Sequence, residues 1–139
     1  MRLKIWRTQL GILLAASLLT AGCLETALLG VGGMAAVGGY KWVEGTMERD
    51  YPRPLPEVWR ATLDACKDLQ LRIVKQNYNP VESHIEAVAP PANTNVKIQL
   101  ISRPNQITTV KFRYGLTGDK DASAYFHRRL AVHLGLPQE

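Results

Sequence analysis

Apolar side chains recur every three or four positions in two stretches of the chain, a spacing typical of helices that bury one face. The first stretch covers residues 55–69, and its apolar positions are Leu55, Val58, Trp59, Thr62, Leu63, Cys66 and Leu69. The second stretch follows Asp119 and Asp121, either of which can cap a helix, and it ends at Gly135 and Pro137. Its apolar positions are Phe126, Leu130 and Leu134. We therefore expect two amphipathic helices.

Other segments alternate apolar and polar side chains over lengths typical of strands. We expect strands at residues 46–51, 71–77, 83–89, 96–102 and 107–114. Short turns rich in proline and asparagine separate the last four, as in an antiparallel meander. The order β-α-β-β-β-β-α predicts an α+β fold in which both helices pack on the apolar face of one antiparallel sheet. The other sheet face is expected to be polar.

Residues 1–22 have the pattern of a bacterial export signal. Basic residues precede an apolar run from Leu10 to Leu19, which is about half the length that a membrane-spanning helix needs. The run leads into Ala21-Gly22-Cys23, which resembles the lipobox of bacterial lipoproteins. The alternative is an ordinary signal peptide cleaved near Ala21, which would leave Cys23 as a free thiol.

The lipobox resemblance implies a membrane anchor. The thiol of Cys23 would receive a diacylglycerol, residues 1–22 would be removed, and the new amine would be acylated. Two or more acyl chains anchor a protein stably, whereas one gives only marginal binding. Because Leu24 stands where an aspartate would favour inner-membrane retention, the resemblance implies the outer membrane, with the domain facing the periplasm.

Residues 27–43 form an apolar segment rich in glycine. One interpretation is a tether, or a segment lying on the membrane surface, between the lipid and the domain. The other is a helix that inserts or packs against a partner, because Gly32 with Ala36 and Ala35 with Gly39 would let another helix approach closely. We expect three parts: a signal at 1–22, the lipidated and apolar segment at 23–44, and the α+β domain at 45–139.

The net charge of +5 does not indicate nucleic-acid binding. Three of the 17 Lys and Arg residues lie in residues 1–22, so the rest of the chain has 14 against 12 acidic residues. Proteins that bind nucleic acid show a much stronger clustered excess. A basic stripe of Lys97, Lys111 and Arg113 on the polar sheet face, with Arg128 and Arg129 on the last helix, has two interpretations. It is a solvated face, or it binds an acidic partner, an anionic glycan or a lipid phosphate.

The sequence lacks a recognisable catalytic or metal-binding motif. His84, His127 and His133 do not have the spacing of zinc ligands, and the segment 118–121 lacks the later ligands of a calcium loop. Cys66 falls on an apolar helix face, where we expect a buried thiol; a disulfide to another chain is the alternative. Ser123 has no surrounding nucleophile motif. We expect no enzymatic activity, no cofactor and no metal site.

From Cys23 onward the chain resembles a family of small, uncharacterised bacterial lipoproteins, a domain of unknown function. The resemblance rests on the lipobox, the Gly/Ala-rich stretch, the signature Val58-Trp59-Arg60-Ala61-Thr62 and the segment 109–115. The expected element order is also similar to the helix-grip domains of a lipoprotein in the outer-membrane barrel-assembly machinery, which is an analogy of fold alone.

These observations predict a non-enzymatic, lipid-anchored envelope protein that binds an unidentified envelope protein and takes part in interaction or assembly. The alternative is a periplasmic domain that binds a small ligand in the groove between the sheet and the last helix. That alternative requires an unfilled cavity in the groove, whereas the bulky side chains predicted there favour a filled core.

Overall fold

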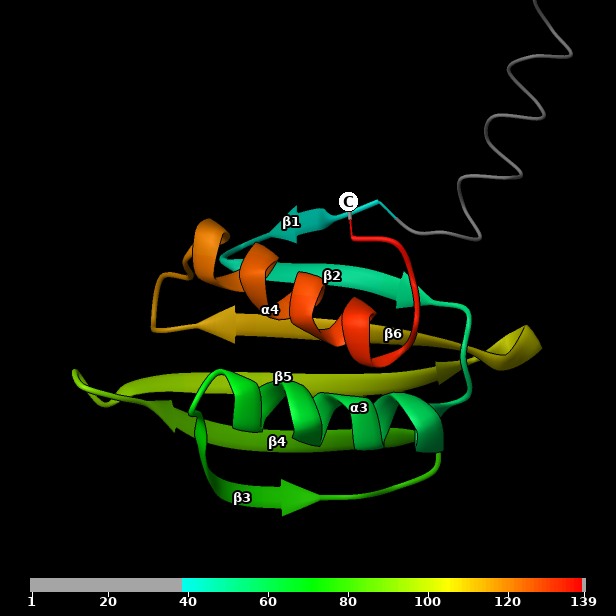
Figure 1. Cartoon of the computed structure of the whole chain (residues 1–139), viewed down its shortest axis with the longest axis horizontal. Coiled ribbons are helices and arrows are strands. Elements are labelled where there is room, and N and C mark those ends of the chain that lie inside the picture. Colours follow the sequence, from blue (N-terminus) through cyan, green and yellow to red (C-terminus); the bar gives the residue numbers. More distant parts are fainter. Residues whose placement is uncertain (1–38, 139) are drawn as a thin grey trace, which may run out of the picture. The chain divides into compact units, whose positions relative to one another are not determined.

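In the computed structural model, which describes residues 39–138, one antiparallel sheet of six strands carries two helices on one face (Figure 1). The elements along the chain are β1 (Lys41–Val43), β2 (Thr46–Tyr51), α3 (Leu55–Asp68), β3 (Arg72–Asn77), β4 (Glu82–Ala89), β5 (Thr94–Arg103), a 3-10 turn (Pro104–Gln106), β6 (Ile107–Tyr114) and α4 (Lys120–His133). The strand order across the sheet is β1-β2-β6-β5-β4-β3. The predicted α+β class and helix-on-sheet arrangement are confirmed.

Strand β1 is the one element that the sequence did not predict. It pairs with β2 through a two-residue turn, Glu44-Gly45, in which both residues have positive φ. Such turns suit hairpins because their twist matches that of the strands. The sheet therefore begins at Lys41, inside the segment expected to be a tether or helix. The ring of Trp42 in β1 lies under the ammonium group of Lys120, with the nitrogen 5.5 Å from the ring centre.

The hydrophobic core lies between the sheet and the two helices. At its centre the rings of Phe112 from β6 and Phe126 from α4 are stacked with their centres 4.1 Å apart. Both helices turn their apolar positions inward, and the predicted residues Leu55, Phe126 and Leu130 are buried. Helix α4 begins where predicted, because the side chain of Asp119 accepts a hydrogen bond from the Ala122 amide at 2.9 Å.

The prediction that Trp59 lies in the core is only partly right. The buried positions of α3 are Leu55, Val58, Ala61, Thr62, Ala65 and Cys66. Trp59 lies on the flank of that face and is only partly buried, with its ring edge-on to Tyr78 at 5.3 Å. The apolar side chains of α3 occupy a wider part of the helix surface than the part that the sheet covers.

Two turns at one end of the sheet touch backbone to backbone. A Cβ atom on Gly118 would lie 2.1 Å from the carbonyl oxygen of Gly45, and one on Gly45 would lie 2.3 Å from that of Thr117. Both glycines also have positive φ. The β1–β2 turn and the loop before α4 are therefore held in contact without a side chain between them.

Neither helix within residues 39–138 combines the length and apolarity needed to cross a membrane.

Candidate binding surface

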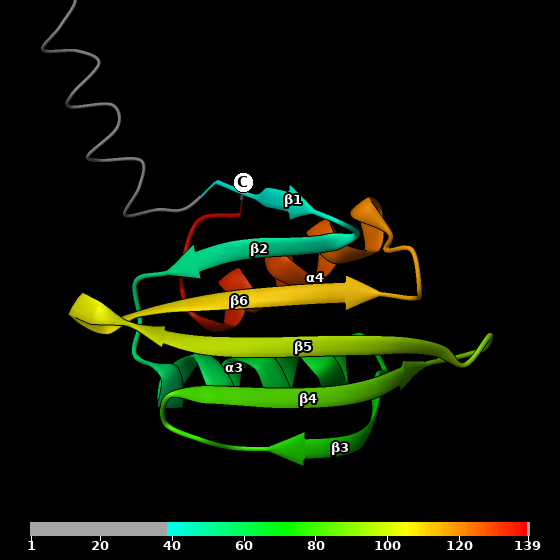
Figure 2. The same ribbon diagram turned by 180° about the vertical axis from the view of Figure 1, so that it is seen from behind.

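The sheet face opposite the helices is open in the described domain (Figure 2). Its polar side chains surround a hollow of about 510 Å³ that opens to solvent. The ionisable side chains lining this hollow are Glu44, Glu48, Lys75, His84, Glu86, Lys97, Lys111 and Arg113. The hollow is a polar, charged depression on the outer face of the sheet, on the side away from the hydrophobic core.

One row of side chains across this face has its charges neutralised. The register places Glu48, Lys111, Gln99 and His84 opposite one another on successive strands. The ammonium nitrogen of Lys111 lies 3.1 Å from a carboxylate oxygen of Glu48, and the ring of His84 lies 3.1 Å from Glu82. Lys111 belongs to the predicted basic stripe, but its charge is balanced within the sheet.

The neighbouring row places two cations directly opposite each other. Lys97 of β5 faces Arg113 of β6, with Glu86 on the other side of Lys97. Within residues 39–138, neither Lys97 nor Arg113 has a carboxylate within ion-pair distance. One guanidinium nitrogen of Arg113 donates a hydrogen bond to the carbonyl of Leu116.

A second hollow, of about 440 Å³, meets the first at this pair. It is lined by Thr94, Asn95, Lys97, Arg113, Gly115 and Leu116. Lys97 and Arg113 line both hollows. Of the three sheet residues in the predicted stripe, these two form no ion pair within residues 39–138.

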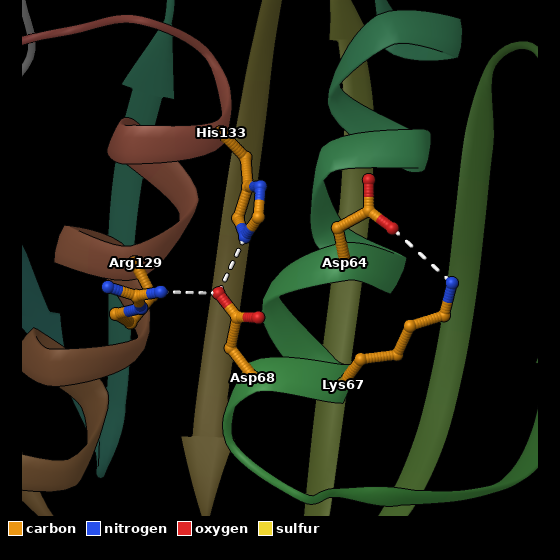
Figure 3. A network of polar contacts seen from close by, with 5 residues as sticks. All are labelled: Asp64, Lys67, Asp68, Arg129 and His133. Atoms are coloured by element: carbon orange, nitrogen blue, oxygen red, sulfur yellow. Dashed lines mark hydrogen bonds and ion pairs between the residues drawn. The ribbon is translucent and has the colours of Figure 1, made fainter.

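Arg128 and Arg129 lie apart from this face, on α4. Arg129 and His133 both contact the same carboxylate oxygen of Asp68 on α3, at 2.5 and 2.7 Å (Figure 3). Hydrogen bonds from Arg129 and His133 hold the pKa of Asp68 below its usual value, and the Asp68 carboxylate raises the pKa of Arg129. The network joins the two helices at their surface, so its role is structural. Arg128 lies over the ring of Tyr125.

A buried polar cluster that the sequence pattern did not predict lies under α4. His127 is fully buried and lies 2.7 Å from the Tyr51 hydroxyl through Nδ1 and 3.2 Å from the Met47 carbonyl through Nε2. Because a carbonyl only accepts, Nε2 carries the proton and Nδ1 accepts from Tyr51. Burial lowers the pKa of His127 to about 4 and raises that of Tyr51, so both are neutral at physiological pH.

Arg49 lies beside this cluster and is 3% exposed. Its guanidinium lies against the rings of Tyr40 and Tyr51 and donates to the Tyr40 hydroxyl at 3.2 Å and to the Pro137 carbonyl at 3.5 Å. It links the beginning of the described domain to its end. In the sequence, Arg49 stands between Met47 and Tyr51 in the alternating pattern of this strand, on the same face as both. That position was the signal from which its burial could have been predicted.

The remaining candidate residues lie away from the hollows. Cys66 is fully buried, and burial raises its pKa to about 12, so the thiol stays protonated. The Ser123 hydroxyl donates to the Asp119 carbonyl at 2.6 Å. No three His, Cys, Asp or Glu side chains of the described domain are grouped so that they could hold a metal ion. Cys23 lies outside the described residues, so its lipidation stays a prediction.

Comparison with known proteins adds a family assignment. A family model described as "Protein of unknown function (DUF3568)" matches residues 7–132. The match includes every strand of the sheet and all of α3. No curated protein matches the chain.

Proposed function

Since this chain belongs to the DUF3568 family, whose description assigns no activity, we propose its function from its sequence and geometry. It is a non-enzymatic, lipid-anchored protein of the bacterial envelope that binds another envelope protein. The binding surface is the open outer face of its sheet. The lipobox-like Ala21-Gly22-Cys23 supports attachment through Cys23, and Leu24 supports the outer membrane, with the domain facing the periplasm.

The observation that carries the proposal is the charged hollow. An antiparallel sheet commonly leaves one polar face in water, so an open face alone is not evidence of binding. Here the face is hollowed to about 510 Å³ and contains opposed cations that lack an ion-pair partner in the described part of the chain. A partner surface with matching charges would satisfy them, which gives specificity and faster association.

The two nucleophile candidates of the sequence, Cys66 and Ser123, do not contribute to this surface. Cys66 and Ser123 are buried on the helix side of the sheet, away from the hollow. The thiol of Cys66 is protonated because burial raises its pKa to about 12. A buried, protonated thiol is a poor nucleophile.

The alternative function, small-ligand binding between the sheet and the last helix, lacks this kind of support. The stacked rings of Phe112 and Phe126 fill that space, and His127 lies edge-on to Phe126 at 5.5 Å. A ligand there would have to displace well-packed aromatic side chains. The free-energy cost of that displacement is several kcal/mol, on the order of the cost of truncating a core side chain. The geometry favours a protein partner on the other face.

Site-specific photocrosslinking in membranes that contain the full-length protein tests the proposal. A photoreactive amino acid would replace Asn77, which lines the hollow, or Lys67, which is exposed on the helix layer. We expect a protein adduct of defined mass from position 77 and none from position 67. Equal adducts from both positions, or no protein adduct from position 77, would contradict a binding surface on the sheet.

A further inference from the structure

We infer that Lys97 and Arg113 are the recognition point of this surface and that the partner supplies carboxylates from an acidic protein segment. This inference rests on the proposed function, because it names the chemistry of the partner for the same face. It is carried by the register of two strands, the two hollows that meet there and the distribution of the other charges.

The opposition of Lys97 and Arg113 is unfavourable, and Glu86, which faces Lys97 from β4 without coming within ion-pair distance, offsets it only in part. Directly opposite residues on neighbouring strands have Cβ atoms about 4.5–5.5 Å apart, and like charges at this separation destabilise a sheet. In the adjacent row the same sheet pairs Lys111 with Glu48 at 3.1 Å. A bound carboxylate between Lys97 and Arg113 would turn this repulsion into two attractions.

The surroundings strengthen such an interaction. Lys97 and Arg113 line both hollows, so a bound side chain would be partly removed from water. Charges in such a setting interact more strongly than on a flat, fully hydrated surface. One guanidinium nitrogen of Arg113 donates to the Leu116 carbonyl, and the remaining N–H groups match the planar geometry of a carboxylate.

The other charges in the hollow favour a protein segment over a lipid surface. Glu44, Glu48 and Glu86 line the same hollow as the cations. A uniformly anionic membrane would meet these carboxylates as well, and a flat bilayer does not fit a concave surface. A protein segment can place single carboxylates next to Arg113 and Lys97 and keep the rest of its charge away from Glu44 and Glu48.

The binding test uses the purified full-length protein in nonionic micelles and a labelled eight-residue peptide of alternating Glu and Gly. Fluorescence anisotropy is measured at low salt. We expect the double variant Lys97→Gln, Arg113→Gln to bind the peptide at least tenfold more weakly than the parent protein. The matched control Arg60→Gln, Lys67→Gln removes the same charge from exposed positions of α3 and should bind as the parent does. Equal weakening in both variants would overturn the inference.

Arg113→Glu separates binding from folding. It places a carboxylate opposite Lys97, so we expect peptide binding to be lost while the midpoint of thermal unfolding is unchanged or raised. Unchanged peptide binding by this variant would overturn the inference. Displacement of the peptide by an equal concentration of inorganic phosphate would also overturn it, because the site would then be a general anion site.

The same variants in the crosslinking experiment distinguish the two proposals. Loss of the protein adduct at position 77 in Lys97→Gln, Arg113→Gln supports the inference. A protein adduct that persists in this variant overturns the inference and leaves the proposed function standing. Adducts to lipid in place of protein overturn both in favour of a membrane contact.

Discussion

Protonation of His127 should remove about 3 kcal/mol from the free energy of unfolding as the pH falls to 4. Burial holds the pKa of this imidazole at about 4, against 6.5 when unfolded, and each unit is worth about 1.4 kcal/mol. Below pH 6.5 the unfolded chain binds a proton that the folded domain excludes, so stability falls with pH. The full stability is present above pH 6.5 and is lost progressively down to about pH 4.

The variant His127→Gln isolates this effect. A glutamine amide can donate to the Met47 carbonyl and accept from the Tyr51 hydroxyl, but it does not titrate. Urea unfolding of residues 39–139 at pH 7 and pH 4.5 gives the loss for each protein. We expect the loss in the parent to exceed that in the variant by about 2 kcal/mol, because pH 4.5 covers most of the interval between the two pKa values.

Two results would refute this reasoning. One is an equal acid loss in the parent and in His127→Gln, which would assign the acid sensitivity to other groups. The other is an imidazole that titrates near pH 6.5 in the folded protein, measured from its ¹⁵N shifts. Asp68 does not affect the comparison, because it contributes equally to the stability of both proteins. That contribution is lost at lower pH, as the carboxylate becomes protonated.

Three other predictions follow from the packing and the N-terminal motif. Trp59→Ala should lower the free energy of unfolding by about 2 kcal/mol, because the side chain is half-buried, whereas Phe126→Ala should lower it by about 3–5 kcal/mol. Urea unfolding measures both losses, and equal losses would contradict the assigned burial of the two side chains. Asp68→Asn should lower the unfolding midpoint slightly at pH 7, because Arg129 and His133 lose a charged acceptor, and the difference from the parent should shrink as the pH falls below the usual range of an aspartate, since the pKa of Asp68 is held low; calorimetry over a pH series checks this. Cys23→Ala should give an uncleaved precursor without labelled fatty acid, and a mutant that is still lipidated would exclude Cys23 as the anchor.

The fold was predictable where periodicity decides it. The alternation around Ile85 and the helical spacing around Phe126 identified the faces that are buried. Strand β1 was missed because it is three residues long and its turn uses Glu44 at positive φ, a conformation that glutamate rarely adopts. Trp59 was placed too deep because spacing gives the direction of a helix face and not the width that the sheet covers.

The sequence predicted the polar face on which the candidate site lies, but it did not predict that Lys97 and Arg113 lie opposite each other. Alternation alone put Lys97, Lys111 and Arg113 on the polar side of the sheet. That Glu48 neutralises Lys111, while Arg113 lies opposite Lys97, depends on strand order and register, because residues far apart in the sequence become neighbours. The buried His127 and Arg49 were missed because polar residues on an apolar face are interpreted as exposed unless their partners are known.

The contact between Gly45 and Gly118 has a consequence for how this sequence can diverge. At most packed positions a larger side chain on one residue can be accommodated by a smaller one on its neighbour. Here both neighbours already have the smallest side chain, and the clash is with backbone atoms. A double substitution therefore cannot rescue a single one, and each position is constrained independently of the other. In a library of random double variants, these two sites should show no compensating combinations.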